Sequence, residues 1–224
     1  MPPFSRDDFF GVFVRYNESM WPLPLLLVAA GLAVAVLASS ASRRSRRLMA
    51  TLAALWAYAA IAYHLAFLSS LTSAGLLFAA LFLAETVLLA WHGVRARRLH
   101  LAVPLDRTSR LVGAALVAYA LIGYPAVAEL VGQRYPAVPT FGLPCPTTIF
   151  TFGVLTWCVR PVPRSVLVVP LLWTLVAMSA AITFGIVEDF ALPIAALVTV
   201  IVLHRRATRT STSASPRRPL QLGF

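Results

Sequence analysis

The chain has 224 residues, of which 59% are hydrophobic and only 12% are charged. A soluble domain of this size cannot hide so much apolar surface from water. All 19 basic residues are arginine, and with 8 acidic residues the formal net charge is +11. Because these arginines cluster in short turns between apolar segments, the composition indicates a membrane protein and argues against a nucleic-acid-binding protein.

The first twenty residues precede the first long apolar segment. Among them, Phe9, Phe13 and Tyr16 recur at the spacing of one helix face. This pattern predicts an amphipathic helix that lies along the membrane interface. No basic region is followed at once by an apolar core, so no removable signal peptide is expected. We expect residues 1–20 to form an external interfacial segment. Trp21 and Pro22 then mark the entry of the chain into the membrane.

Seven apolar segments follow, and a helix needs about 20 residues to cross a bilayer core about 30 Å thick. The predicted segments are 21–41, 48–68, 74–94, 111–131, 146–159, 165–184 and 186–203. The sequence therefore predicts an all-α polytopic transmembrane bundle of about seven helices over residues 21–203. The fifth segment is short and would cover only about 21 Å as a helix. It must gain length from neighbouring backbone, thin the bilayer, or fail to cross.

The arginines indicate how the bundle is oriented. With seven crossings, sixteen of the 19 arginines fall on one side, and only Arg6, Arg15 and Arg134 fall on the other. The positive-inside rule then predicts an external amino terminus and a cytoplasmic carboxyl terminus. A re-entrant fifth segment would move every arginine from Arg160 onward outside and is disfavoured. Residues 204–224 are polar and contain prolines, so we expect a disordered basic cytoplasmic tail.

Several polar residues lie within the predicted spans, where each is costly and needs a reason. Glu85 is the most prominent, because it lies 11 residues into its segment and so near the midplane. With His64, Tyr119, His92 and Glu129 it would form a polar column through the bundle. Since Glu and His can change charge, the column predicts a proton or cation path. The alternative is a set of interhelical hydrogen bonds that only fix the bundle.

A second constellation is FGLPCPTTIFTFG, residues 141–153. Pro146 suits the first position of a helix, which would place Cys145 near a cap where the helix dipole lowers a thiol pKa. A thiolate or soft-metal site at the external mouth would follow. The alternative is a helix start defined by proline, with Thr147, Thr148 and Thr151 bonding back to the backbone. No second ligand is near in sequence, so no metal site is predicted.

This segment and FFGVFVRYNESMWP, residues 9–22, resemble the motifs of a family of small bacterial multi-pass membrane proteins of unknown function. Similar hydropathy extends over most of the chain. The resemblance implies the same multi-pass topology and a place in the bacterial cytoplasmic (inner) membrane. It also draws attention to Cys145, Pro146, Thr147 and Thr148, but it implies no activity.

Two functional hypotheses follow. The first is a transporter or channel for a small solute or ion, with Glu85 as the protonatable group and residues 145–151 lining the external entrance. The second is a non-catalytic membrane scaffold or partner subunit, in a homo-oligomer or with another membrane protein. An enzyme is not favoured, because HExxH, Walker, GxSxG and CxxC motifs are lacking. No cofactor is expected, since a chain without lysine cannot form a retinal Schiff base.

Overall fold

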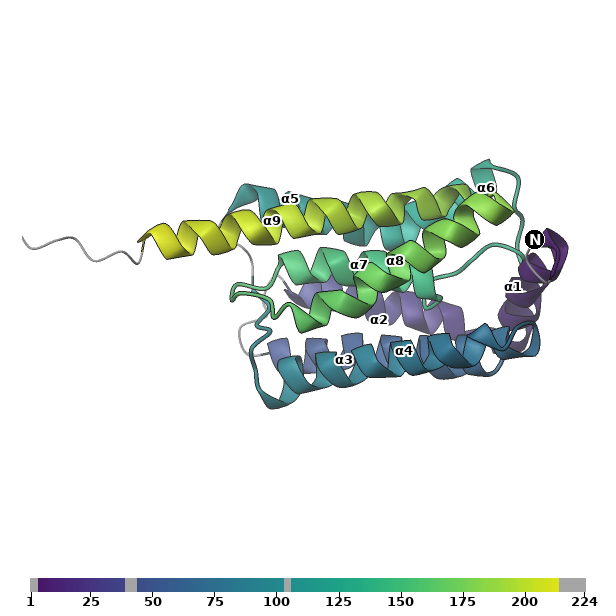
Figure 1. The fold of residues 1–224 in the computed structure, drawn as a ribbon, viewed down its shortest axis with the longest axis horizontal. Coiled ribbons are helices and arrows are strands. Elements are labelled where there is room, and N and C mark those ends of the chain that lie inside the picture. Colours follow the sequence, from purple (N-terminus) through teal and green to yellow (C-terminus); the bar gives the residue numbers. More distant parts are fainter. Residues whose placement is uncertain (1–3, 39–43, 103–105, 214–224) are drawn as a thin grey trace, which may run out of the picture.

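The computed structural model describes residues 4–38, 44–102 and 106–213, and over these ranges the chain is an all-α bundle (Figure 1). The helices in chain order are α1 Arg6–Met20, α2 Leu23–Ala38, α3 Ser45–Tyr58, α4 Ala74–Leu89, α5 Arg107–Ala118, α6 Tyr124–Leu130, α7 Pro144–Thr156, α8 Ser165–Phe184 and α9 Ala191–Ser213. Three π-helical segments extend α3, α4 and α5, namely η2 Ala59–Leu65, η4 Ala90–Arg95 and η5 Tyr119–Gly123. Short 3-10 turns are η3 Leu68–Ser70 and η6 Val187–Phe190.

Five helical stretches in the described chain are long and apolar enough to cross a membrane. They are Ser45–Ser70, Ala74–Arg95, Arg107–Leu130, Ser165–Phe184 and Val187–Arg209. The pair α1 and α2, bent by 87° at their junction, makes a sixth if it counts as one span. The prediction of an all-α helical membrane bundle is therefore confirmed.

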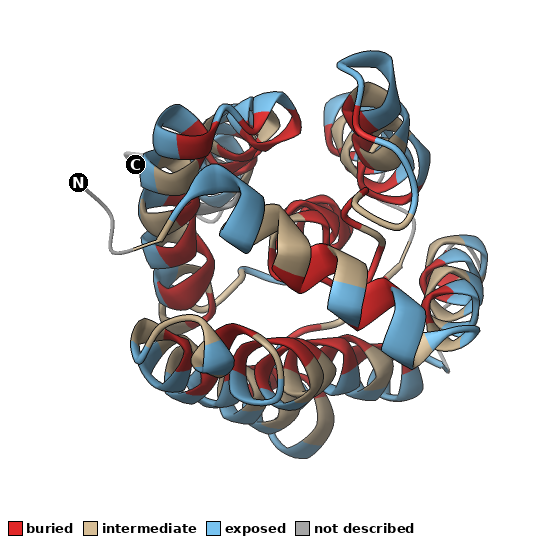
Figure 2. Ribbon diagram, turned by 90° about the vertical axis from the view of Figure 1, so that its right-hand side faces the viewer, coloured by how far each residue is buried: buried red, intermediate tan, exposed pale blue. Residues whose placement is uncertain are grey.

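The short fifth segment becomes the central helix of the bundle. Of the residues in α7, only Cys145 is not fully buried. The helix has 13 residues, so it spans about 20 Å, less than a bilayer core. It packs against α5, α9, α8 and α3. Figure 2 looks along the bundle and shows buried residues turned inward and exposed residues turned outward.

Glycines allow α7 to approach α5 closely. A methyl group on Gly153 would lie 2.9 Å from the carbonyl oxygen of Gly113, and one on Gly113 would lie 2.2 Å from Nε1 of Trp157. Three of the four buried threonines in α7, Thr148, Thr151 and Thr156, donate hydrogen bonds to carbonyls of their own helix, whereas the Thr147 hydroxyl has no hydrogen-bond partner among the described residues. Thr148 donates to the carbonyl of Pro144 and Thr151 to that of Thr147, both at 2.8 Å. An interior helix can therefore carry threonines without unpaired donors at these positions.

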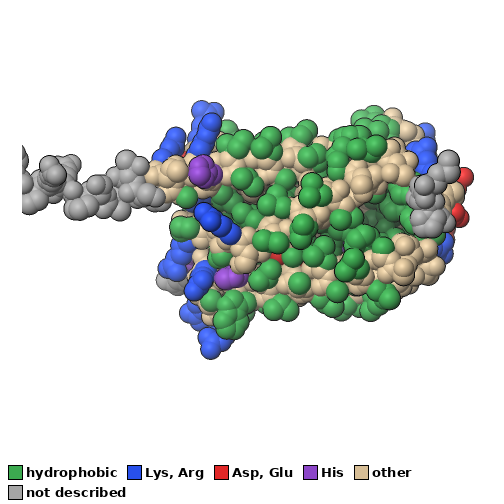
Figure 3. All heavy atoms as spheres, viewed as in Figure 1, with side chains coloured by type: hydrophobic (Ala, Val, Ile, Leu, Met, Phe, Trp, Pro, Cys, Tyr) green, Lys and Arg blue, Asp and Glu red, His purple; other side chains and the backbone are tan. Residues whose placement is uncertain are grey.

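One end of the bundle gathers the arginine-bearing turns (Figure 3). The end of α7 lies there, because Arg160 Nη1 donates to the carbonyl of Arg97 at 3.4 Å and Trp157 Nε1 to that of Arg110 at 3.3 Å. A re-entrant fifth segment would carry Arg160 to the opposite end, and that arrangement is not found. The last helix, α9, continues to Ser213. It therefore includes the first part of the segment expected to be disordered, while residues 214–224 lie outside the described residues.

The amphipathic helix predicted near the amino terminus is α1, which lies across the other end of the bundle (Figures 1 and 2). A capping box starts it, in which Asp8 N donates to Ser5 Oγ and Ser5 N donates to Asp8 Oδ2. Its inner face buries Val12, Phe13 and Tyr16. The hydroxyls of Tyr16 and Tyr58 lie 2.8 Å apart, which ties α1 to α3.

Asn17 fixes α1 to the loop that leads into α7. Its side-chain nitrogen donates to the carbonyls of Pro136 and Val138 at 2.7 and 2.8 Å, and its oxygen accepts from Thr140 at 2.9 Å. The side chain of Asn17 is fully buried. The loop after α6 is thus held beneath α1, and it delivers the start of α7 into the interior.

Candidate functional site

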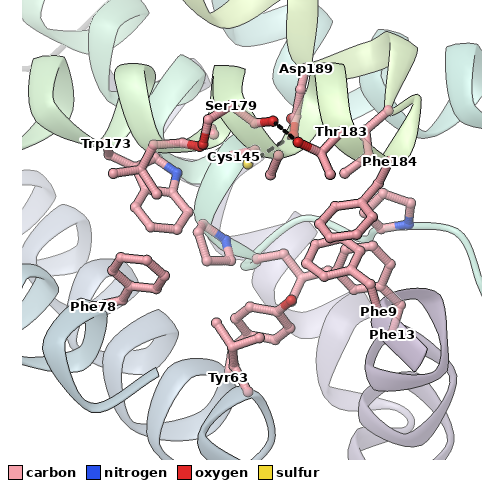
Figure 4. A pocket seen from close by; sticks show the side chains of 18 of the residues that line it. Phe9, Phe13, Tyr63, Phe78, Cys145, Trp173, Ser179, Thr183, Phe184 and Asp189 are labelled. Carbon is pink, nitrogen blue, oxygen red and sulfur yellow. Dashed lines mark hydrogen bonds between the residues drawn. The ribbon is translucent and has the colours of Figure 1, made fainter. Parts of the chain in front are cut away.

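A pocket of about 340 Å³ lies beneath α1, at the end of the bundle away from most of the arginines. Its walls come from α1, η2, the first turns of α4, the start of α7 and the second half of α8 (Figure 4). In Figure 3 a hollow opens on the side of the bundle between α8 and α4, close to α1. If the helices cross a bilayer along the bundle axis, this opening faces lipid near one surface of the membrane.

Aromatic rings from several helices contribute to the wall. Among them are those of Phe9, Phe13, Tyr63, Phe78, Trp173 and Phe184. The rings of Phe9 and Phe184 stack at 4.8 Å and join α1 to the end of α8. The rings of Phe78 and Trp173 meet edge to face at 5.3 Å and join α4 to the middle of α8. The pocket is therefore mainly apolar, and these two ring contacts connect the helices that form its walls.

A small polar cluster lies at the inner side of the pocket. Cys145 Sγ donates to Oδ2 of Asp189 at 3.4 Å. The hydroxyl of Tyr124 donates to Oδ1 of the same carboxylate. Asp189 is only 2% exposed. These contacts join the first turn of α7, the first turn of α6 and the 3-10 turn η6 around one carboxylate.

Local backbone geometry brings Asp189 inward. Gly185 ends α8 in the left-handed region, at a φ of 68°, which glycine adopts without a steric penalty. The chain then turns through η6, and the neighbouring Glu188 accepts from Gln133 Nε2 at 3.1 Å. The Tyr119 hydroxyl donates to the Glu188 carbonyl at 3.0 Å. Two adjacent acidic residues are thus directed into the bundle instead of into solvent.

In the part of the chain that the structure describes, no hydrogen bond or ion pair joins the members of the predicted polar column to one another. Glu129 is exposed, Tyr119 contacts Glu188, and the ring of His92 lies 3.1 Å from Ser165 Oγ. Within the described residues, the buried side chains of His64 and Glu85 have no hydrogen-bond partner. The His64 ring instead contacts Phe82 at 4.6 Å and Trp173 at 5.1 Å. His64 therefore stands directly behind one wall of the pocket, and Glu85 does not line it.

The predicted entrance motif is only partly at the pocket. Cys145 and Pro146 line it, whereas Thr147, Thr148 and Thr151 are buried away from it in the interior. The helix begins at Pro144 instead of Pro146, so Cys145 lies within the first turn. Its thiol donates a hydrogen bond to the Asp189 carboxylate, an arrangement that opposes thiolate formation. In the described ranges, no three His, Cys, Asp or Glu side chains are grouped as metal ligands would be.

Sequence reasoning missed Asp189 and the aromatic wall. One signal for Asp189 was present: two adjacent acidic residues, Glu188 and Asp189, interrupt the start of the predicted segment 186–203, in a chain with only 8 acidic residues. The aromatic wall had no comparable signal, because its rings come from four elements that are distant in sequence.

Comparison with known proteins identifies the family but no activity. No curated protein and no solved structure matches the chain. Residues 6–214 match a family described as a family of unknown function, DUF6064. Since this match spans nearly all of the bundle, the protein belongs to DUF6064.

Proposed function

We propose that this protein is a multi-pass protein of the bacterial cytoplasmic membrane that transports a small amphipathic molecule, which it takes from the bilayer into the pocket beneath α1. The observation that carries the proposal is the cavity of about 340 Å³ with aromatic walls, opening on the flank of the bundle. Ligand pockets are concave, mostly apolar and furnished with a few converging polar groups, and this one has Cys145, Tyr124 and Asp189.

The proposed orientation follows from the charges at the two ends. The arginine-rich end would face the cytoplasm and α1 would lie outside, as the positive-inside rule requires. The chain would then cross the membrane seven times. These crossings would be the five long apolar stretches, the bent pair α1 and α2, and α7 together with the loop before it. The pocket would lie in the outer half of the membrane, and its side opening would meet the outer leaflet.

The binding group differs from the one expected from sequence. Glu85 is buried without a hydrogen-bond partner in the described part of the chain and lies outside the pocket lining. A path for ions past Glu85 would need water that reaches it. Asp189 instead lies on a cavity that a molecule can enter, so we assign the solute to the pocket and not to the midplane carboxylate.

The test is whether the purified protein retains a small molecule in this pocket. Ala177 lines the pocket and is 2% exposed, so Ala177→Trp should fill the space. Ala84 on α4 faces outward, and Ala84→Trp is the matched control. Native mass spectrometry should find a bound small molecule on the wild type and on Ala84→Trp but not on Ala177→Trp. Equal occupancy of all three proteins would contradict the proposal.

Transport is a separate step from binding. The retained molecule is loaded into proteoliposomes that contain either the wild type or Ala177→Trp. Its rate of efflux from the vesicles should be higher with the wild type. Equal rates would exclude transport and favour the alternative, a non-catalytic scaffold or partner subunit whose pocket holds a structural lipid.

A further inference from the structure

We propose that the molecule bound beneath α1 is a lipophilic organic cation, an amine or quaternary ammonium group that pairs with Asp189 inside the aromatic wall. This inference rests on the proposed function and specifies the chemical class of its ligand. Three features of the described residues support it: the charge of the lining, the arrangement of the rings and the free acceptor sites of the carboxylate.

The first feature is the sign of the charge. Of the described residues that line the pocket, Asp189 is the only acidic one, and none is Arg, Lys or His. Glu188 beside it adds a second acidic side chain, which is also buried. On α1, the guanidinium of Arg6 lies over the ring of Phe10 at 5.1 Å, and its positive charge also acts on Glu188. A negatively charged ligand would be repelled in this low-dielectric site, whereas a cation would be attracted.

The second feature is the arrangement of aromatic rings. A cation is attracted to the face of an aromatic ring within about 6 Å of its centroid, and quaternary ammonium ligands are recognised by such cages. Trp173 and Phe78 stand at 81° to each other, so their faces point in different directions. Tyr63 and Phe13 add two more rings, 6.0 Å apart, from the opposite side (Figure 4). Apolar substituents on nitrogen would contact these rings.

The third feature is the state of the carboxylate. A carboxylate offers about four acceptor sites, and here the donors to Asp189 are the neutral side chains of Tyr124 and Cys145. The structure has no ion pair to Asp189 within the described ranges. A purely structural role as the cap of α9 would direct its oxygens to backbone N–H groups, but they accept from these two side chains instead. A cation would supply the charge partner that a buried carboxylate needs.

The binding test uses two uncomplicated probes of the same shape. Benzyltrimethylammonium and neopentylbenzene differ only in whether the branched atom is a charged nitrogen or a neutral carbon. Equilibrium dialysis of the full chain in a non-ionic detergent measures both, with Ala177→Trp as the blank for uptake by micelles. The wild type should bind the cation at least about tenfold more tightly than the neutral probe. Asp189→Asn should abolish this preference, and Asp189→Glu should largely keep it.

The outcomes separate the two proposals. If the neutral probe binds the wild type above the blank and as tightly as the cation, the charge assignment is overturned while the proposed function stands. If neither probe binds above the blank, both are contradicted. The comparison of the charged and the neutral probe on the wild type tests the charge assignment even if Asp189→Asn fails to fold.

The cation can be a free lipophilic molecule or the choline headgroup of a lipid, because the chemistry of both is the same. Nanodiscs of phosphatidylcholine and of phosphatidylglycerol distinguish these sources. If the headgroup is the ligand, benzyltrimethylammonium should bind less tightly in phosphatidylcholine than in phosphatidylglycerol. Equal, Asp189-dependent binding in both would identify a free cation. Binding in both that does not depend on Asp189 would overturn the assignment.

Discussion

The thiol of Cys145 donates to Oδ2 of Asp189, 3.4 Å away, and so joins the start of the central helix α7 to η6, the turn that leads into α9. The Tyr124 hydroxyl donates to the other oxygen of the same carboxylate. The helices α6 and α7 therefore meet η6 at one buried acidic side chain. This junction is both a structural contact and the polar side of the pocket.

The hydroxyl of Tyr124 should matter for stability because it satisfies a buried carboxylate. Tyr124→Phe should lower the free energy of unfolding by about 1–3 kcal/mol, the usual cost of leaving a buried polar group unpaired. In the double variant Tyr124→Phe/Asp189→Asn the losses should be less than additive, because both changes remove the same contact. Thermal unfolding in detergent measures the four proteins, and strict additivity would contradict the coupling.

Asn17 should hold the loop before α7 in place. Asn17→Ala would leave the carbonyls of Pro136 and Val138 and the hydroxyl of Thr140 without their partner. We expect faster amide hydrogen exchange over residues 131–143 and a loss of about 1–3 kcal/mol of stability. Glu18→Ala, at the exposed next position, is the control and should leave exchange in that loop unchanged. Equal effects of the two substitutions would argue against the anchor.

The close contact of α5 with α7 should not tolerate a methyl group. Gly113→Ala would place its Cβ 2.2 Å from Trp157 Nε1 and 2.5 Å from Thr156 Oγ1. Such overpacking should cost about 1–3 kcal/mol, visible as a lower unfolding temperature. Gly11→Ala on α1 meets nothing closer than 3.6 Å, and it should be neutral or slightly stabilising because alanine favours a helix. A stable Gly113→Ala protein would show that the helices lie farther apart.

At the arginine-rich end, Asp106 should stabilise the bundle in a pH-dependent way. Asp106 Oδ1 accepts from Ser109 N at 2.7 Å, and Oδ2 lies 3.8 Å from Arg206 Nε. Burial acts to raise the pKa of Asp106, but the hydrogen bonds from Ser109 and the charge of Arg206 outweigh it and lower the pKa below 3.8. A carboxylate with a lowered folded-state pKa stabilises above its ordinary pKa, and this stabilisation is lost as the pH falls through the lowered value.

Asp106 is also the N-cap residue of α5. Two substitutions of Asp106 separate the contribution of its charge from that of helix capping. Asp106→Asn should keep most of the helix cap, because asparagine caps well, and it should lose only the charge contribution at pH 7. Asp106→Ala should lose about 1 kcal/mol more. Near pH 3 the difference between the wild type and Asp106→Asn should shrink. Unfolding temperatures at the two pH values test this, and a difference that grows toward low pH would contradict the assignment.

Much of the fold could be predicted from the apolar segments. The predicted segments 74–94 and 165–184 coincide closely with Ala74–Arg95 and Ser165–Phe184, and the amphipathic pattern located α1. Long apolar runs between charged turns fix such helices whatever their neighbours are. The short segment was predicted at 146–159 and found at Pro144–Thr156, but its central position could not be inferred, because burial depends on what packs around it.

The site was harder to predict, because it depends on which helix faces meet. Glu85 and His64 were expected to share a polar column, yet the His64 ring faces Phe82 and Trp173, and Glu85 has no hydrogen-bond partner in the described chain. Cys145 was predicted as an entrance residue and does line the pocket. Asp189 lies in the predicted segment 186–203 and was not singled out, because its inward direction depends on the turn at Gly185 and on its contacts with Tyr124 and Cys145.

The most direct test of the account is an experimental density map of the protein in lipid nanodiscs, because occupation of the pocket beneath α1 is its central claim. We predict density for a small molecule between Phe78 and Phe184, in contact with Asp189, and no such density in Ala177→Trp. A wild-type map in which side chains close the pocket and leave no space beside Asp189 would contradict it.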